Sequence, residues 1–479
     1  MLNAKGENKS VFKATSWYLV CDFLIKGISF ITMPIFTRMM STSEIGSFSI
    51  LSSWISILSV VVTLNLIQSV FLAKYDYKND YDGFISTIST LGFLSVLSCY
   101  IVIFPFRNEV AHFLCIDEYA LDVMSVHLMF CQMSAVLLAK YRANFEYTKS
   151  VFLTIGTTLI VTASAIICTV VLDDSLKGRI YGTFAPTIII NVCLFIFFLY
   201  RRSSFKWEYC KYALAICVPL IIHNLAGNLM HSSDRVMIGK FCSAEDTGLY
   251  SVAYSCAMFA NVIRNSMVTA WNPWLFDNLN SNKVEEIRKG SYVLLTAFFL
   301  LCVGIIMFAP EFLYILGGNA YVSAKYVVPP VVSAYCFSMV YSLYAGVEQY
   351  YKKQKFFALF AVPCALFNIL LNYLLIPVYG YIAAAYTTMA CLALECFLHY
   401  VNVKRMNMSH VYNGKFNVVI IILMLGMILM SEVAYRSNMV RYSAVLCFFV
   451  ISITLVMRYK NKILEIISTR YNKNDKHTC

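Results

Sequence analysis

Long apolar stretches separated by short polar ones make up most of this chain. Each stretch is long enough to cross a hydrocarbon core of about 30 Å as a helix, which takes roughly 20 residues. The strict alternation of apolar and polar residues that is typical of an outer-membrane barrel is missing from the sequence. The pattern predicts an all-α integral membrane protein of fourteen helices, at 14–36, 46–72, 84–106, 119–139, 150–172, 179–200, 212–234, 248–271, 291–310, 325–347, 356–377, 380–401, 416–434 and 440–457.

The composition supports this class. Hydrophobic residues make up 59% of the 479 positions and charged residues 13%, whereas soluble proteins are about 45–50% apolar. Most of the 17 cysteines lie inside apolar spans and no CxxC pair occurs, so they are interpreted as small core residues, with no disulfide framework, metal site or cofactor. The polar N-terminus enters the first span without a small-residue cleavage site, which favours a retained anchor over a signal peptide.

Basic residues are concentrated in alternate connections between the spans. They lie near the N-terminus, at 140–149, 201–211, 352–355 and 404–405, and in the C-terminal tail. An even number of helices places both termini on this side, and the positive-inside rule makes it the cytoplasm. The formal net charge of +12 is explained by this topology and by contact with lipid headgroups, so nucleic acid is not an expected partner.

The chain contains an internal repeat. Residues 38–46 match 240–248 at a shift of 202, and the same shift carries Gly178 onto Gly380. We predict an N-terminal six-helix lobe (1–202), a C-terminal six-helix lobe (203–404), two additional transmembrane helices (405–458) and a basic cytoplasmic tail (459–479). Two lobes of even helix number share one orientation, as in transporters that alternate access around a site between repeats. Chance coincidence of small residues is the alternative explanation.

A polar stripe follows the seventh span. Asn224, Asn228, His231 and Arg235 recur at steps of four, three and four, which places them on one face of a helix. Polar groups are costly when they face lipid, so this face is expected to border the protein interior or a water-filled cavity.

Charged residues within the spans are the strongest functional candidates. Arg264 lies mid-span between Asn261 and Asn265, with no acidic residue in its own helix, and is the first of these candidates. Asp22 and Lys26 are four residues apart on one helix face, and either pair with each other or line the cavity.

Other polar residues have structural explanations beside functional ones. Asn65 and the seventh-span amides would surround the same cavity if the first, second, seventh and eighth helices line it, but each amide alone also suits a helix-to-helix hydrogen bond. Asp234 and Arg235 are interpreted as an interfacial ion pair near the outer end of the seventh helix. Glu348, Glu395 and His127 are interpreted as isolated and structural.

No enzyme is predicted. The longest connections, near 107–118 and 272–290, are too short for a catalytic domain, and the sequence lacks a P-loop, a nucleophile elbow and an HExxH motif. A transporter of this kind draws its energy from an ion gradient, the membrane potential or later consumption of its cargo.

Several loose motifs, in a characteristic order, resemble one family. They are PIFTR at 34–38, SDRVMIG at 233–239, GLYSVAY at 248–254, WNPW ending the eighth helix at 271–274 and YGYIAAA at 379–385. Together they resemble the O-antigen, capsule and exopolysaccharide flippases of the multidrug/oligosaccharidyl-lipid/polysaccharide exporter superfamily, over roughly residues 10–400.

The resemblance implies a bacterial inner-membrane protein with two lobes around a central cavity that opens alternately to cytoplasm and periplasm. Its cargo would be an undecaprenyl-pyrophosphate-linked oligosaccharide, its partners the lipid bilayer, a polysaccharide polymerase and a chain-length regulator, and its coupling ion H+ or Na+. A cationic lumen is expected from Lys26 and Arg264, made less basic by Asp22 and Asp234. The expected substrate-binding residues are Asp22, Lys26, Asn65, Asn224, Asn228, His231, Asn261 and Arg264. The thirteenth and fourteenth helices lie outside this core and leave open a relation to the peptidoglycan-precursor flippases.

Two alternatives remain. An ion-coupled drug exporter of the same superfamily would bind a cation at acidic lumen residues, and Arg264 and Lys26 argue against a cationic cargo. A polysaccharide polymerase or a lipid-dependent glycosyltransferase would need a larger loop outside the membrane than this sequence provides.

Overall fold

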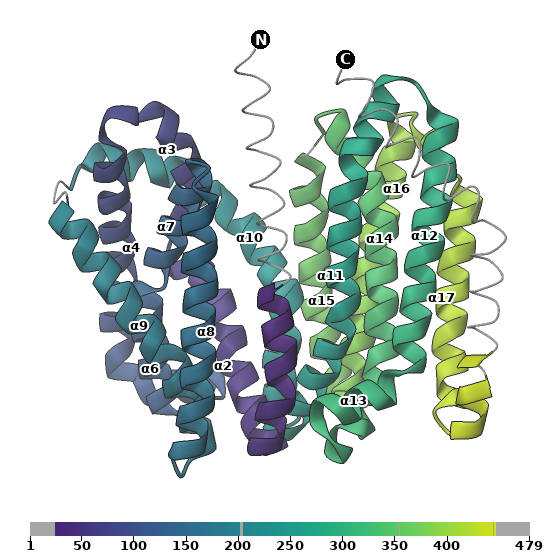
Figure 1. The fold of residues 1–479 in the computed structure, drawn as a ribbon, viewed down its shortest axis with the longest axis horizontal. Coiled ribbons are helices and arrows are strands. Elements are labelled where there is room, and N and C mark those ends of the chain that lie inside the picture. The colour runs from purple at the N-terminus through teal and green to yellow at the C-terminus, as the bar shows by residue number, and fades with distance from the viewer. Residues whose placement is uncertain (1–23, 202–204, 354, 444, 447–479) are drawn as a thin grey trace.

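Two helical bundles stand side by side in the computed structural model (Figure 1). It describes residues 24–201, 205–353, 355–443, 445 and 446, and every regular element in these ranges is a helix. The expected all-α fold is therefore confirmed. Asp22 and most of the fourteenth span, at 444 and 447–457, lie outside the described residues.

The first bundle, before residue 202, begins with the helix that reaches residue 39. It continues with α2 (Thr42–Val62), η1 (Leu66–Ser69), α3 (Val70–Asp76), η2 (Lys78–Asp80), α4 (Tyr81–Ile103), η3 (Phe104–Phe106), α5 (Arg107–Leu114), α6 (Glu118–Phe130), α7 (Gln132–Ala143), α8 (Tyr147–Val171) and α9 (Ser175–Arg201).

The helix α10 (Trp207–Phe241) runs obliquely from the first bundle to the second in Figure 1. The second bundle consists of α11 (Ala244–Asn280), α12 (Val284–Met307), α13 (Ala309–Gly317), η4 (Asn319–Val327), α14 (Val328–Tyr350), α15 (Lys355–Tyr379), α16 (Ile382–Arg405), η5 (Ser409–Val411) and α17 (Gly414–Ala434). In this bundle α17 packs against α12 and α14.

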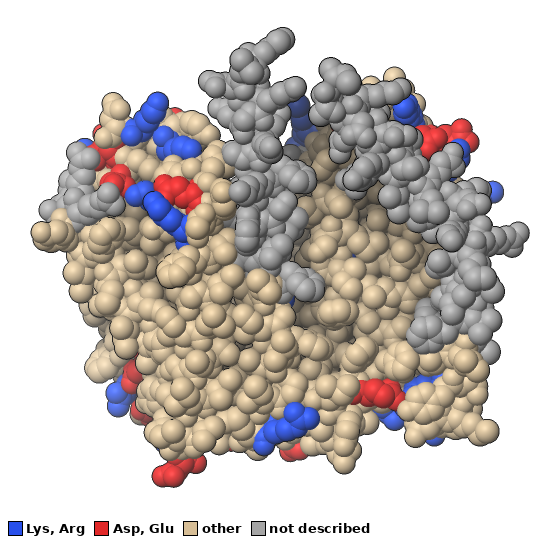
Figure 2. Space-filling model, viewed as in Figure 1, with Lys and Arg blue, Asp and Glu red and all other residues tan. Residues whose placement is uncertain are grey.

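The helices are built to cross a membrane. Within the described residues, eleven helices are long and apolar enough to do so. Figure 2 shows the consequence on the visible surface, where charged side chains gather at the two ends of the helices and leave an uncharged belt between them. We call the end that carries Lys140, Lys206, Lys352 and Lys404 the basic end, and the end at which α2 and α11 begin the opposite end.

Three expected boundaries were wrong. The second span is interrupted after Val62, because Leu64 and Asn65 adopt left-handed backbone conformations with φ of 54° and 51°. The expected connection near 107–118 contains α5, and most of the one near 272–290 is helical, because α11 continues to Asn280 with Pro273 inside it. WNPW therefore does not end the eighth helix.

The two repeated segments begin α2 and α11 and meet at the opposite end. Ser41 caps α2 in a capping box with Glu44, and the Ser243 side chain accepts a hydrogen bond from the Asp246 backbone N–H at the start of α11. Just inside these caps, a methyl carbon added to Gly46 would lie 2.8 Å from the backbone nitrogen of Gly248. The repeated glycines thus let the two helix backbones touch and join the bundles here.

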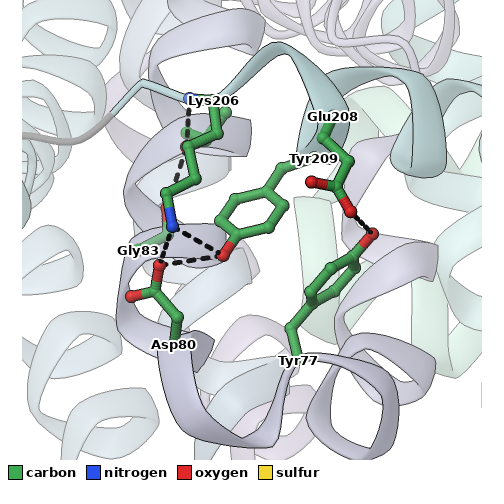
Figure 3. Close-up of polar contacts among 7 residues, drawn as sticks. Tyr77, Asp80, Gly83, Lys206, Glu208 and Tyr209 are labelled. Atoms are coloured by element: carbon green, nitrogen blue, oxygen red, sulfur yellow. Dashed lines mark hydrogen bonds and ion pairs between the residues drawn. The ribbon is translucent and has the colours of Figure 1, made fainter.

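The start of α10 is fastened to the first bundle at the basic end (Figure 3). Lys206 Nζ lies 2.7 Å from Asp80 Oδ2, which also accepts a hydrogen bond of 2.8 Å from the Tyr209 hydroxyl, and the Tyr77 hydroxyl donates to Glu208. The hydrogen bond to Asp80 raises the pKa of the Lys206 ammonium. Farther along, α10 packs against α15 of the second bundle. Since Pro219 lies inside the helix between these two regions, a bend at this point is the expected way for α10 to follow both bundles.

Candidate functional site

Arg264 lies in the middle of α11 and is held by neutral groups alone. Its Nε donates to Asn261 Oδ1 at 3.1 Å, Nη1 to Ser342 Oγ at 2.9 Å and Nη2 to Asn265 Oδ1 at 2.7 Å. Among the described residues no carboxylate forms an ion pair with it. The guanidinium is therefore oriented by hydrogen bonds while its positive charge stays available to an anion.

Two more basic side chains, His231 and Arg235, lie one turn apart on α10, and His231 is the one near Arg264. His231 is near enough to interact electrostatically with both Arg235 and Arg264. The Arg235 guanidinium stacks 4.6 Å from the ring centre of Tyr254 and donates to the His231 carbonyl oxygen. We call His231, Arg235 and Arg264 the basic cluster. The sequence placed Arg235 on the polar stripe of the seventh span but not among the expected substrate-binding residues, because its neighbour Asp234 suggested an ion pair.

Lys26 lies at about the same depth as Arg264. The rings of Phe30 and Phe259 are 6.2 Å apart, which places the helix that ends at residue 39 beside α11. Lys26 is one turn before Phe30 and shares its face, while Arg264 is five residues after Phe259 on a helix of opposite direction. Both are thus displaced toward the basic end, by roughly 6 and 7.5 Å at 1.5 Å per residue. The Lys26 side chain is exposed, and no described acidic group pairs with it.

The surface is recessed between the bundles in the upper half of Figure 2. On the helices between the bundles, His231 and Asn265 are exposed although both lie well inside the long helices α10 and α11. At the opposite end, by contrast, Gly46 and Gly248 bring α2 and α11 into backbone contact. The molecule is thus closed at the opposite end and open toward the basic end.

The remaining amides are arranged in different ways. Asn228 donates to the Ser56 carbonyl oxygen at 2.7 Å and ties α10 to α2, which is the helix-to-helix bond that the sequence left open. Asn224 is half-buried on the same helix. Asn65 is 7% exposed in the break after α2, and its amide nitrogen has no hydrogen-bond partner among the described residues.

Asp234 is not the interfacial ion pair that the sequence suggested. It is 1% exposed, and none of its contacts is a salt bridge to Arg235 in the described residues. Its Oδ2 accepts hydrogen bonds from the Tyr250 hydroxyl at 2.6 Å and the Thr388 hydroxyl at 2.8 Å, and its Oδ1 accepts one from Asn372 Nδ2 at 2.7 Å. The partners come from other helices, and the helices of Asn372 and Thr388 are far away in the sequence, which is why helix periodicity could not reveal them.

More oxygen atoms surround this carboxylate. Thr387 donates to Asn372 Oδ1, and Asn368 Oδ1 accepts from Ser233 at 3.3 Å. We call Asp234, Tyr250, Asn368, Asn372, Thr387 and Thr388 the Asp234 cluster. It joins α10, α11, α15 and α16 inside the second bundle. One carboxylate with neutral amide and hydroxyl oxygens is a donor set that suits a hard monovalent cation as well as a hydrogen-bonded core.

Glu348 is not isolated either. It is fully buried, and its carboxylate accepts a 2.7 Å hydrogen bond from Asn402 Nδ2 and lies 2.8 Å from His399 Nδ1. These partners are on α16, about fifty residues away in the sequence. The expectation that Glu348 is isolated was wrong, because the packing of α14 against α16 creates a buried carboxylate–imidazole pair.

Comparisons with known proteins agree with this geometry. The family model described as polysaccharide biosynthesis protein matches residues 11–279, more than half of the chain, and a second model, MatE, matches residues 219–374. Protein 1 of the Lsg locus of Haemophilus influenzae is 23% identical over 365 residues, which cover 72% of this chain and 86% of that protein. The "Probable low-salt glycan biosynthesis flippase Agl15" of Haloferax volcanii is 22% identical over 213 residues, 42% of this chain and 43% of that protein.

A solved structure titled lipid II flippase MurJ in an inward closed conformation superimposes with a TM-score of 0.69. The alignment covers 93% of this chain and 99% of that chain at 15% identity. At this identity the likeness establishes a shared fold.

Proposed function

Because the chain belongs to the polysaccharide biosynthesis protein family, we propose that it is a flippase for undecaprenyl-pyrophosphate-linked oligosaccharide repeat units. It carries them from the cytoplasmic to the periplasmic face of the bacterial inner membrane, with both termini in the cytoplasm. The observation that carries this proposal is Arg264, a mid-membrane cation held by neutral groups only. The name of one relative, a probable glycan biosynthesis flippase, supports a cargo that contains a glycan.

The cargo's pyrophosphate is the group that the basic cluster would bind. An anion that enters a space walled by apolar helices loses hydration, and a cation about 4 Å away returns about 4 kcal/mol per charge pair at an effective dielectric near 20. Arg264 supplies this charge, and Lys26 lies at about the same depth on the neighbouring helix. Asn261 and His231 add hydrogen-bonding groups close by, and Asn224 lies farther along the same face of α10.

Transport proceeds by alternating access. With α2 and α11 in contact at Gly46 and Gly248, the lumen is open toward the basic end, which the positive-inside rule assigns to the cytoplasm. Loading from the cytoplasm is followed by separation of the glycine crossing and closure at the basic end. The cargo then leaves toward the periplasm, where a polymerase and a chain-length regulator would use it.

The Asp234 cluster is the proposed site of a coupling ion, H+ or Na+. Its carboxylate is fully enclosed and lies beside the segment of α10 that carries Arg235. A cation bound there neutralises a buried charge and changes how α10 packs against α15 and α16. This is a route from ion binding to the position of the basic cluster.

The match to the MatE model favours a second candidate, an ion-coupled exporter of small compounds. The basic cluster would repel a cationic drug, so this alternative is restricted to neutral or anionic compounds.

Replacement of Arg264 tests the proposal in cells. We expect Arg264→Ala to abolish surface polysaccharide and to accumulate lipid-linked repeat units on the cytoplasmic face at a normal protein level. Arg264→Lys should retain part of the activity because the charge is kept and only the planar fork is lost. Lys26→Ala should be less severe, and Lys289→Ala, an exposed lysine outside the cluster, should behave as wild type. Normal export by both Arg264→Ala and Lys26→Ala would contradict the role of the cationic lumen.

A further inference from the structure

A cavity of about 440 Å³ lies in the second bundle at the opposite end of the molecule. Its walls come from α13, from η4 and from the helical segment that begins at residue 438, and Figure 1 shows α13 at the lower edge of the bundle. The lining residues with polar or aromatic side chains are Glu311, Tyr314, Asn319, Lys325, Asn438 and Arg441. Because sites for small molecules measure about 300–1,000 Å³, the cavity is large enough for such a ligand.

An ion pair in the cavity lining has hydrogen-bonding capacity left over. Arg441 is 5% exposed, and its Nη2 pairs with Glu311 Oε1, which also accepts a hydrogen bond of 2.8 Å from the Tyr442 hydroxyl. The other carboxylate oxygen, Glu311 Oε2, and the Arg441 Nε are buried and have no hydrogen-bond partner among the described residues. Buried polar atoms without partners are costly. This wall therefore combines one acceptor and one donor whose hydrogen bonds a ligand would complete.

The rim of the cavity adds an aromatic face and more polar groups. Tyr314 is 56% exposed, and Asn319 and Asn438 are exposed as well, each with an amide that both donates and accepts. Lys325 is half-buried, and its ammonium donates to the Tyr435 carbonyl oxygen at 3.0 Å while keeping further donors. A tyrosine at a membrane interface is by itself an ordinary belt residue. Here, however, a cavity with donors and acceptors lies beside it.

These groups favour one chemical class of ligand. A hydroxyl group both donates and accepts, so adjacent hydroxyls match the unpaired Glu311 Oε2 and Arg441 Nε together. A phosphodiester headgroup only accepts hydrogen bonds, and the carboxylate oxygen would repel it. A purely apolar ligand would leave both polar atoms unpaired. A sugar ring has hydroxyls at its edge and an apolar face that suits the exposed ring of Tyr314.

We propose that this cavity binds a short saccharide, with Tyr314 against a sugar ring and the Glu311–Arg441 pair on its hydroxyls. The site goes beyond the proposed flippase function, because none of its described lining residues belongs to the basic cluster or the Asp234 cluster. Only the identification of this saccharide with the cargo's glycan, met on the periplasmic side, rests on the proposed function.

The position of the cavity fits an encounter with cargo that is leaving. The Leu316 carbonyl oxygen, on α13, accepts a hydrogen bond from the Thr37 hydroxyl of the first bundle. The segment that lines the cavity thus also holds the two bundles together at the opposite end. A saccharide bound there would lie beside the contact that must separate before the lumen opens on this side.

The test uses the purified full-length protein in nanodiscs without any glycoside detergent. The probe is the free oligosaccharide released by mild acid from the lipid-linked repeat units of the cells that make this protein, and its Kd is measured by saturation-transfer NMR. We expect Tyr314→Ala to weaken binding about tenfold, as loss of one aromatic contact would. Tyr314→Phe keeps the ring and should bind as the wild type does. The matched control is Tyr379→Ala, an exposed tyrosine at the end of α15 that does not line the cavity.

A second variant and a competing probe make the result decisive. Asn438→Ala, at an exposed rim position, should also weaken binding, and glycerol phosphate should not displace the oligosaccharide. Unchanged Kd values in both Tyr314→Ala and Asn438→Ala would overturn the proposal. So would binding of glycerol phosphate in place of the oligosaccharide, which would indicate a lipid-headgroup site, or binding that is lost in Arg264→Ala but kept in Tyr314→Ala, which would place the sugar in the lumen.

Failure of this proposal is distinguishable from failure of the proposed function. A wild-type protein that flips lipid-linked repeat units in liposomes but does not bind the free oligosaccharide overturns the saccharide cavity alone. A protein that binds the oligosaccharide in a Tyr314-dependent manner but does not flip the lipid-linked form overturns the flippase proposal alone.

Discussion

The contact between α2 and α11 offers the sharpest test of how the molecule closes. A methyl carbon on Gly46 would lie 2.7 Å from the carbonyl carbon of Ala244 and 2.8 Å from the backbone nitrogen of Gly248. These atoms belong to the backbone and cannot rotate away. Gly46→Ala therefore requires the two helices to move apart at the opposite end, and Gly248→Ala requires the same because its methyl carbon would lie 3.0 Å from the Thr42 carbonyl carbon.

The size of the effect follows from these distances. Carbon atoms in contact prefer a separation of about 3.5–4.0 Å, so the helices must separate by about 1 Å. Overpacking of this kind costs typically 1–3 kcal/mol, and here the cost applies only to the state in which the crossing is closed. A bias of that size changes the ratio of closed to open molecules by about 5- to 150-fold.

The assay is labelling of a reporter cysteine by a membrane-impermeant thiol reagent applied from outside the cell. His231→Cys places the reporter cysteine in the opening between the bundles. The labelling of the same protein without this reporter cysteine is measured separately and subtracted as background. We expect Gly46→Ala to raise labelling severalfold. Gly156→Ala is the matched control, since an added methyl carbon there meets nothing within 4 Å.

Two results would refute this reasoning. One is labelling of folded Gly46→Ala that does not exceed the Gly156→Ala control. The other concerns thermal stability and is informative even if the single variants are made poorly. Once the helices have moved apart to make room for one added methyl group, the second methyl group costs little further stability. The double variant Gly46→Ala with Gly248→Ala should therefore lose clearly less thermal stability than the sum of the losses in the two single variants. Full additivity would show that the glycines do not share one contact.

Two more predictions concern the ion site and the fastening of α10. Asp234→Asn should remove any acceleration of flipping by an imposed Na+ or H+ gradient. The control Asp277→Asn, at an exposed residue, should keep that acceleration. An unchanged gradient response in Asp234→Asn would exclude the Asp234 cluster as the ion site. The hydrogen bond to Asp80 raises the pKa of Lys206 above its ordinary value of 10.5, so this contact contributes stability that is fully present below that value and is lost as pH rises through the raised pKa. The thermal stability of the wild type should consequently fall in this alkaline range more than that of Lys206→Gln, and equal losses would contradict the assignment.

The sequence predicted the fold class well because hydrophobic runs report directly on helices that cross a membrane. It also identified Gly46 and Gly248 as equivalent, and the structure brings these residues together. Element boundaries were harder, since the break at Leu64 and Asn65 involves left-handed backbone without any glycine or proline to announce it.

The candidate site was only partly visible in the sequence. Arg264 stood out because a lone arginine in an apolar span needs an explanation. Asn261 and Asn265 flank it in the sequence, but its third neutral partner, Ser342, could not be assigned because it lies on another helix. The sequence analysis assigned Asp234 to the membrane interface because it lies near the end of a span, and a sequence pattern does not show how deeply such a residue is buried in the protein. Its partners Asn372 and Thr388 are about 140 and 150 residues away in the chain.

The most direct test of the proposed function is flipping by the purified protein in liposomes loaded with an undecaprenyl-pyrophosphate-linked oligosaccharide, read as the fraction of sugar accessible on the far leaflet over time. The account predicts that wild-type protein moves the lipid faster than protein-free liposomes, that Arg264→Lys retains part of this rate, and that Arg264→Ala is no faster than the protein-free control. Flipping by Arg264→Ala at the wild-type rate, or a wild-type rate equal to that of protein-free liposomes, would contradict it.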